Sequence, residues 1–310
     1  MLLHEHLENG ADKNPNFPFS EFEGNSLSYQ EANLLSNQLA NKLVSEGLEV
    51  GDRFAFLAKN CTEMAIMYYA ASKVGAVPVP LNYRLADQEW AYIINDSEAK
   101  LIIVKGNEYS DRINQISSEL KNVKKYISIS LDNSIEKFQD FYDWLSDSSN
   151  EKPTLKIHEN DDVYQMYTSG TTGHPKGAVL LQRNVAANIR QYLNSLTLPR
   201  PSRTLLVAPM YHAAAMINMC GCIAIGGTIV IQEDFIPQDV VDCLANEKIT
   251  HTVLVPAMIQ ACLVSVPNVA SNEYNDLDQI HYGASPIAPE TLKKAMDVFK
   301  CKFGQGFGMT

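Results

Sequence analysis

Residues Val163–Gly177 read VYQMYTSGTTGHPKG and carry the most specific structural signal in this chain. The first five of these residues are rich in β-branched and aromatic side chains, which predicts a buried strand. The glycines that follow allow successive backbone N–H groups to turn toward one point, and such a nest binds anions. Hydroxyl groups and a lysine add donors and positive charge. We therefore expect a polyphosphate-binding loop built from Thr168, Ser169, Gly170, Thr171, Thr172, Gly173 and Lys176.

The loop differs from the Walker A motif. No Gly-Lys-Ser/Thr sequence closes it, and Pro175 precedes the lysine. A polar surface turn without a ligand is the alternative interpretation of a loop rich in glycine and hydroxyl groups. The position of the loop directly after a strand, and its Pro-Lys-Gly ending, favour phosphate binding.

Residues 167–177 resemble the phosphate loop of the adenylate-forming superfamily, which includes acyl-CoA synthetases, aryl-CoA ligases, luciferases and the adenylation domains of peptide synthetases. The family pattern is Tyr-Thr-Ser-Gly-Thr-Thr-Gly-x-Pro-Lys-Gly, and the chain matches it throughout. The resemblance implies that the loop holds the β- and γ-phosphates of ATP while a carboxylate attacks the α-phosphorus. It also implies a catalytic role for Lys176, which would share the neutralisation of phosphate charge with Mg²⁺.

The composition is that of a folded, acidic protein. The 310 residues suffice for one large or two ordinary domains, and 45% of them are hydrophobic. A formal net charge of −11 argues against nonspecific nucleic-acid binding, which requires a basic face. The six cysteines include no Cys-x-x-Cys pair, and the first residues carry acids and no basic segment. We expect reduced cysteines, no signal peptide and a cytoplasmic location.

One uncharged stretch, residues 213–231, has nearly the length of a membrane span. A span needs about 20 residues of continuous helix, and Gly226 and Gly227 interrupt this stretch before a β-branched run. We expect a buried helix, a turn and a buried strand. The sequence leaves peripheral membrane association and the oligomeric state open.

Predicted strands alternate with predicted helices along most of the chain. A first helix is expected between Ser28 and Gly47. Strands are expected at 53–58, 76–80, 100–104, 125–129, 163–167, 178–181, 204–208, 227–231, 251–255 and 278–282. Further helices are expected at 62–73, 87–95, 110–120, 135–145, 182–196, 213–225, 237–246, 256–264 and 289–299.

This alternation predicts an α/β fold with two similar lobes of mostly parallel sheet flanked by helices. We place the lobes at residues 50–198 and at 1–49 plus 199–310. The phosphate loop would lie at their junction, beyond the carboxyl end of a strand of a parallel sheet. The order of the strands cannot be read from the sequence.

The segment Pro209–His212 follows a predicted strand and opens the uncharged helix. It resembles the family's Pro-x-aromatic-His motif, whose ring borders the acyl site, and this resemblance assigns Tyr211 and His212 to the substrate. The apolar turn that follows suits a hydrocarbon wall, so we add Met216 and Ile217 to the substrate-binding residues. An ordinary role in the core is the alternative for these side chains.

Two further segments resemble nucleotide-contacting motifs of the family. Residues 282–286 match a Gly-Gly-Ala-Pro-like segment whose backbone lies against adenine, with alanine here in place of the second glycine. Residues 304–310 match a Gly-x-aromatic-Gly-Met/x-Thr-Glu pattern, in which the aromatic ring stacks on adenine and the threonine faces the α-phosphate. The resemblance assigns a catalytic role to Thr310 and nucleotide contacts to Gly283, Ala284, Ser285, Gln305, Gly306, Phe307, Gly308, Met309 and Thr310.

The resemblance covers nearly the whole chain, but the chain covers only part of the family pattern. The magnesium-binding acid expected after Thr310, the Thr-Gly-Asp motif that grips ribose, the hinge, and the C-terminal domain with its catalytic lysine have no counterpart in these 310 residues. We therefore expect an incomplete N-terminal AMP-binding domain that is inactive by itself.

The function implied for the full-length protein is ATP-dependent formation of acyl-AMP, followed by thioester formation with coenzyme A, on a fatty or other apolar acid. A peptide-synthetase domain would be expected to place Phe-Asp near residue 212, and no aspartate occurs in residues 209–232. Alternatives within the family are an aryl- or hydroxycinnamoyl-CoA ligase and a ligase that loads a carrier protein. An alternative of another class is a noncatalytic module that holds a nucleotide or an acyl chain.

Overall fold

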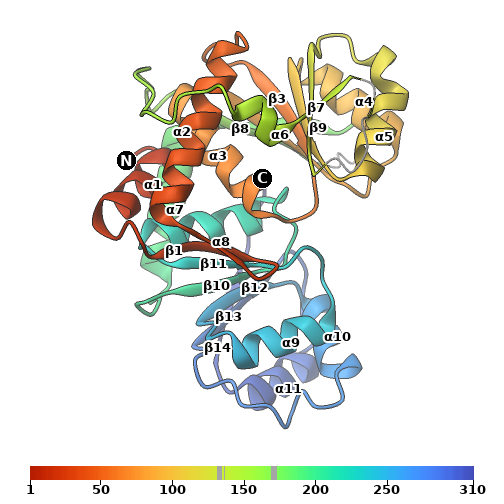
Figure 1. Cartoon of the computed structure of the whole chain (residues 1–310). Coiled ribbons are helices and arrows are strands. Elements are labelled where there is room, and N and C mark those ends of the chain that lie inside the picture. The colour runs from red at the N-terminus through yellow and green to blue at the C-terminus, as the bar shows by residue number, and fades with distance from the viewer. Residues whose placement is uncertain (131–134, 136, 169–172) are drawn as a thin grey trace. The chain divides into compact units, whose positions relative to one another are not determined.

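The computed structural model describes residues 1–130, 135, 137–168 and 173–310 (Figure 1). The chain divides into two compact units. Unit 1 comprises Met1–Asn9, Gln30–Lys59 and Glu63–Ala187, and unit 2 comprises Gly10–Tyr29, Asn60–Thr62 and Asn188–Thr310. The lobe boundaries expected from the sequence differ from this division, because residues 1–9 and 30–49 lie in unit 1 and residues 60–62 and 188–198 lie in unit 2.

Side chains of helix α2 (Tyr29–Ser45) explain why most of this helix belongs to unit 1. Asn37 donates to the carbonyl oxygen of Asn150 at 3.0 Å, and Gln38 donates to that of Leu145 at 2.8 Å. Each bond joins residues more than a hundred positions apart. Local periodicity carries no information about such contacts, although it does place the start of α2 correctly after Ser28.

The main sheet of unit 1 is entirely parallel, with the strand order β4-β3-β5-β6-β7. These strands are β3 (Arg53–Leu57), β4 (Val77–Leu81), β5 (Leu101–Lys105), β6 (Lys125–Ile129) and β7 (Phe138–Asp140). The accompanying helices are α1 (Leu3–Lys13), α3 (Thr62–Val74), α4 (Asp87–Asp96), α5 (Asn107–Ile116), η1 (Ser117–Glu119) and α6 (Phe141–Leu145). Helix α3 is buried along almost its whole length, as is typical of a helix that is apolar on all sides.

The strand before the phosphate loop lies in neither parallel sheet. Strands β8 (Asp162–Thr168) and β9 (Lys176–Leu181) form a separate antiparallel pair. The expectation that the loop extends from a parallel sheet is therefore wrong. The short connection, residues 169–175, explains why β9 runs antiparallel to β8, because a parallel crossover needs about a dozen residues or more.

The sheet of unit 2 has the order β14-β13-β12-β10-β11-β1-β2, and every neighbouring pair is parallel except β1–β2. Its strands are β1 (Pro18–Phe22), β2 (Asn25–Ser28), β10 (Arg203–Leu206), β11 (Thr228–Ile231), β12 (His251–Leu254), β13 (Gln279–Gly283) and β14 (Lys302–Gly306). The accompanying helices are α7 (Gln182–Ser195), α8 (Ala213–Ala224), α9 (Pro237–Asn246), α10 (Pro256–Ser265) and α11 (Pro289–Phe299).

The two faces of the unit 2 sheet differ in character. Helices α9, α10 and α11 cover one face (Figure 1) and form an apolar core with strand residues such as Leu205, Leu254 and Ile280. Helix α8 lies on the opposite face, where the hydroxyl of Thr204 donates to Asn218 Oδ1 at 3.2 Å. The face that carries α8 therefore contains buried polar groups, whereas the other face is apolar.

Both parallel sheets share one strand order. If β3 to β7 are numbered one to five along the chain, the sheet reads 2-1-3-4-5, and β10 to β14 numbered in the same way also read 2-1-3-4-5. In such doubly wound sheets, ligands bind beyond the carboxyl ends of the strands where the order reverses. In unit 2 this switch point lies between β10 and β12. The predicted α/β class, with parallel sheets flanked by helices, is confirmed.

The sequence patterns miss several elements. Helix α1, the β1–β2 hairpin and strand β14 have no counterpart among the expected elements. The helix expected at 135–145 is mostly wrong, because α6 begins only at Phe141 and β7 precedes it. Asp140 sets this start by capping the helix, since its side chain accepts from the backbone N–H groups of Tyr142 and Asp143 at 2.9 and 3.1 Å.

The uncharged stretch at 213–231 folds as helix α8, a turn and strand β11, as expected. Within the described part of the chain, no helix combines the length and the apolar character that crossing a membrane requires. All six cysteines are free; five are buried and Cys301 is half-buried.

Candidate active site

The stem of the predicted phosphate loop is the β8–β9 hairpin in unit 1. Thr168, the last residue of β8, pairs with Lys176, the first residue of β9. Lys176 is exposed, and Gly173 has a φ of +116°, a conformation that favours glycine. The loop residues Ser169, Gly170, Thr171 and Thr172 lie outside the described residues. The hairpin thus holds the two ends of the loop opposite each other, with the lysine at its base.

Helix α4 braces this stem. The hydroxyl of Tyr167 donates to Asp96 Oδ2 at 2.6 Å, and burial together with this bond raises the pKa of Tyr167. One turn earlier on α4, the ring of Tyr92 stacks on His174, with ring centroids 4.5 Å apart and ring planes inclined by 17°. Tyr167 precedes the loop and His174 lies near its end, so both sides of the loop are anchored to the same helix.

Strand β9 requires glycine opposite Tyr167. A Cβ atom at Gly177 would collide with Nε2 of Gln165 and would lie 2.9 and 3.0 Å from two ring atoms of Tyr167. The Tyr167 ring cannot move freely, because Asp96 holds its hydroxyl and Gln165 donates to the same oxygen at 3.1 Å. The last glycine of the loop motif is therefore needed for the packing of the stem.

In unit 2, the segment Pro209–His212 follows β10 and lies at the switch point of the sheet. The buried side chain of Asn60 positions this segment. Its Oδ1 accepts from the backbone N–H of Met210 at 2.8 Å, and its Nδ2 donates to the carbonyl oxygens of Ala208 and Gln232 at 3.1 and 3.2 Å. Asn60 thereby ties together the chain beyond the carboxyl ends of β10 and β11.

The predicted substrate-binding residues surround the start of α8. Tyr211 is buried, whereas His212, the N-cap residue of α8, is exposed. Their rings lie 4.3 Å apart and are inclined by 53°. Met216 is buried and Ile217 is half-buried one turn further along. An accessible imidazole beside an apolar turn is suited to bind an acid with an apolar body.

The two predicted nucleotide-binding segments leave neighbouring strands at the same edge. Gly283 and Gly306 are register partners at the ends of β13 and β14. Gly283–Ser285 and Phe307–Thr310 therefore begin side by side in unit 2. The ring of Phe307 is 93% exposed, which leaves its face accessible to a stacking partner.

Ala284, which stands where the family has its second glycine, carries backbone strain. Its φ is +67°, in the left-handed region that a Cβ atom makes unfavourable. We expect A284G to raise the free energy of unfolding by about 1 kcal/mol, as measured by urea denaturation. The control A261G, within helix α10, should lower it by about 1 kcal/mol. A loss of stability in A284G would contradict a left-handed Ala284.

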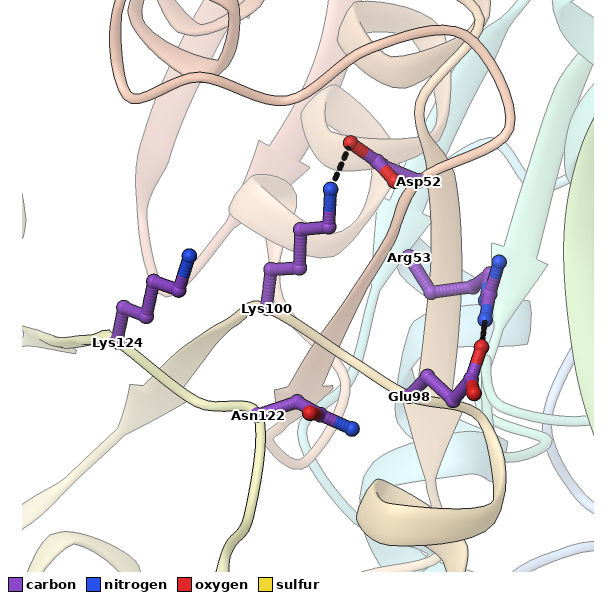
Figure 2. Close-up of a pocket in the computed structure, with 6 residues that line it drawn as sticks. All are labelled: Asp52, Arg53, Glu98, Lys100, Asn122 and Lys124. Atoms are coloured by element: carbon purple, nitrogen blue, oxygen red, sulfur yellow. Dashed lines mark hydrogen bonds and ion pairs between the residues drawn. The ribbon is translucent and has the colours of Figure 1, made fainter.

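A polar hollow elsewhere in unit 1 contains none of the predicted site residues. Figure 2 shows its lining residues, Asp52, Arg53, Glu98, Lys100, Asn122 and Lys124. Its charges largely cancel, because Lys100 pairs with Asp52 and Arg53 pairs with Glu98, each at 2.6 Å. The hollow lies at the amino ends of β3, β5 and β6, whereas ligands of such sheets bind at the carboxyl ends. We assign it no catalytic role.

The predicted site residues fall into two groups. Thr168, Gly173 and Lys176 belong to unit 1. The segments at 211–217, 283–285 and 305–310 belong to unit 2, where the ends of β10, β13 and β14 bring them to one edge of one sheet.

The residues that position these segments are not predicted from the sequence. Asp96 lies 71 positions from its partner Tyr167, and Asn60 lies 150 positions from Met210. No local sequence signal marks either residue, since each acts through a partner that only the folded chain brings near.

Comparison with known proteins shows the family of the chain. The family model described as "AMP-binding enzyme" matches residues 7–310. The chain is 30% identical over 286 residues to the long-chain-fatty-acid–CoA ligase FadD13 of Mycobacterium tuberculosis, covering 92% of this chain and 55% of that protein. It is also 30% identical to a feruloyl-CoA synthase of an Amycolatopsis species, covering 93% of this chain and 55% of the relative. The chain thus spans about half the length of the curated relatives it matches.

Solved structures show the same fold. The N-terminal domain of FACL13 from Mycobacterium tuberculosis, crystallised with an inhibitor, superposes with a TM-score of 0.90 at 26% identity, covering 99% of this chain and 76% of that one. The anthranilate CoA ligase AuaEII superposes with a TM-score of 0.93 at 19% identity, covering 99% of this chain and 60% of the other, and this likeness concerns the fold alone. From the phosphate-loop motif, the shared fold and the family match over residues 7–310, we conclude that the chain belongs to the AMP-binding enzyme family.

Proposed function

We propose that this chain is the ATP-binding part of an enzyme that converts a carboxylic acid to acyl-AMP and then transfers the acyl group to coenzyme A. The observation that carries the proposal is the hairpin stem, which sets Thr168 opposite Lys176 at the base of a glycine- and hydroxyl-rich loop. Catalysis of the first step consists largely of positioning the reactants and neutralising charge around phosphorus. Lys176 and the loop N–H groups supply that charge, and Thr310 faces the α-phosphate.

The acid that we propose is a fatty or other apolar acid. The buried Met216 and half-buried Ile217 beside His212 support an apolar body for the substrate. An aryl-CoA ligase is the second candidate, because the chain is as similar to a feruloyl-CoA synthase as to a long-chain fatty-acid ligase, at 30% identity in both cases. A carrier protein in place of coenzyme A is the third, since a fatty acid–[acyl-carrier-protein] ligase of Streptomyces coeruleorubidus is also 30% identical.

We propose that Mg²⁺ enters with the nucleotide. Across residues 1–130, 137–168 and 173–310, no three His, Cys, Asp or Glu side chains lie together so as to hold a metal ion. Mg²⁺ commonly binds through substrate phosphates and one or two carboxylates, not in a cage of protein ligands. The ion would supply charge neutralisation at the phosphates that Lys176 contacts. We place the enzyme in the cytoplasm, which agrees with its six free cysteines.

The test is ATP–pyrophosphate exchange by the whole protein with a panel of fatty, hydroxycinnamic and amino acids. We expect exchange with fatty or aryl acids and none with amino acids. Exchange with amino acids alone would reject the proposal. Residues 1–310 alone should bind ATP in a calorimetric titration without forming acyl-AMP, and acyl-AMP formation by this part would contradict its expected inactivity.

A further inference from the structure

The last turn of helix α4 carries a carboxylate that contacts the stem of the phosphate loop. Asp96 Oδ2 accepts from the hydroxyl of Tyr167 at 2.6 Å, the short distance of a charge-assisted hydrogen bond. The contact between the hydroxyl of Tyr92 and Asp96 Oδ1 is 3.5 Å long and correspondingly weak. The bond to Tyr167 is therefore the contact through which Asp96 can act on the loop.

The turn that carries Asp96 is fixed from the side of strand β3. Nε of Arg53 donates to the carbonyl oxygen of Ser97 at 2.5 Å, and Nη2 of Arg53 pairs with Glu98 at 2.6 Å (Figure 2). Nη1 of Arg53 donates to the carbonyl oxygen of Gly51 at 3.1 Å. Because the guanidinium is planar and rigid, these bonds hold the end of α4 against the start of β3.

Two further features fix the main chain around Asp96. Glu98 has a φ of +53°, and a residue other than glycine keeps this strained conformation only where its surroundings enforce it. On the other side of Asp96, Asn95 donates to the carbonyl oxygen of Glu119 at 3.0 Å and accepts from the backbone N–H of Lys121 at 2.9 Å. The carboxylate of Asp96 thus reaches Tyr167 from a fixed position.

Tyr167 transmits this position to both ends of the loop. Its partner on strand β9 is Gly177, and the next pair is Thr168 with Lys176. The Tyr167 ring lies so close to Gly177 that a Cβ atom there would be 2.9 Å from the ring. A shift of this ring would therefore displace β9 as well as β8, and with them the residues that begin and end the loop.

Asp96 itself is unsuited to bind a phosphate. A carboxylate repels a polyphosphate, although Asp96 is exposed and salt screens such repulsion. Two roles of Asp96 therefore predict opposite results when the carboxylate is removed. If Asp96 acts only through its charge, ATP would bind more tightly without it. If Asp96 holds Tyr167, ATP would bind more weakly.

We propose that Asp96 is a positioning residue for ATP, which acts through Tyr167 and keeps the stem in the geometry that binds the phosphates. This inference rests on the proposed function and deepens it, because it adds a residue that lies outside the predicted site. Misplacement of a reacting group by about 1 Å can lower a rate by about 10²-fold. Water can partly replace Asp96 as the partner of the half-buried Tyr167 hydroxyl, so we expect a smaller loss, of about tenfold.

The test is ATP–pyrophosphate exchange by the whole protein with the D96A variant. We expect the KM for ATP to rise about tenfold. The KM for the acid should stay close to the native value, because the residues that we propose for the acid belong to unit 2. A general loss of folded protein would lower kcat and leave both KM values unchanged. An unchanged or lower KM for ATP in D96A would overturn the inference and leave the proposed function intact, whereas absence of exchange by the native protein with every acid would refute the proposed function itself.

Further variants separate the bond from the charge. D96N removes the charge but keeps an oxygen that can accept from Tyr167, so it should retain most of the ATP affinity that D96A loses. Y167F removes the hydroxyl and keeps the ring, and we expect it to raise the KM for ATP at least as much as D96A. The control D111A removes an exposed carboxylate of helix α5 in unit 1 and should leave the KM for ATP unchanged.

A double variant shows whether Asp96 acts through Tyr167. Both single variants break the same bond, so D96A/Y167F should be no more impaired than Y167F. Multiplication of the two single effects would contradict action through Tyr167. A D96N variant as impaired as D96A would likewise contradict a role for the bond.

Discussion

Replacing Lys176 by alanine is expected to lower the rate of ATP–pyrophosphate exchange by about 10²–10³-fold, the loss typical of removing one donor that stabilises transition-state charge. Lys176 is exposed at the first residue of β9, opposite Thr168. Its ammonium group therefore lies outside the core. Because Lys176 is exposed, we expect the K176A variant to have a free energy of unfolding within about 0.5 kcal/mol of that of the native protein.

A matched control separates this effect from a general loss of positive charge. Lys121, also exposed in unit 1, lies in the connection before β6, and K121A should exchange at the native rate. K176R keeps the charge but changes its geometry, so it should retain part of the activity. An unchanged exchange rate in K176A would contradict a phosphate contact, whereas a large loss of stability would point to a structural role.

Replacing Gly177 by valine is expected to disrupt the stem of the loop. The added side chain would occupy the space of the Tyr167 ring and of Gln165, and overpacking of this kind costs about 1–3 kcal/mol of stability. Because Tyr167 would also lose its bond to Asp96, the Tyr167 side of the loop would no longer be held against α4. We expect ATP to bind at least tenfold more weakly, a change of about 1.4 kcal/mol.

Urea denaturation and calorimetric titration of residues 1–310 measure the two effects of G177V. G177A should lie between G177V and the native chain, because its Cβ meets the same atoms with less bulk. The control V179A, on the same strand and 46% exposed in the native chain, should change stability by no more than about 0.5 kcal/mol. Native ATP affinity in a folded G177V would contradict the importance of the stem.

Most helices and strands are predictable from the sequence because their signals are local. The apolar run before residue 105 predicts β5, and proline at the first helical position marks α9, α10 and α11. The strand order cannot be predicted in this way, because strand pairing depends on contacts between segments that are distant in the sequence. Neither periodicity nor composition shows that β10 lies between β11 and β12, or that α2 bonds to the chain near residue 150.

The residues of the candidate site are likewise predictable only where their signal is local in the sequence. The phosphate loop is recognisable because all of its chemistry is contained within eleven consecutive residues, 167–177. The side chains that hold the loop, Asp96 and Tyr92, come from helix α4, and no local sequence pattern marks either of them.

A crystal structure of the protein with ATP would show directly whether the β8–β9 hairpin binds phosphate. We predict that the β- and γ-phosphates bind at the β8–β9 hairpin, with the Nζ atom of Lys176 within hydrogen-bond distance of a phosphate oxygen. An ATP molecule bound elsewhere, with no phosphate at residues 168–176, would contradict a phosphate-binding role for this hairpin.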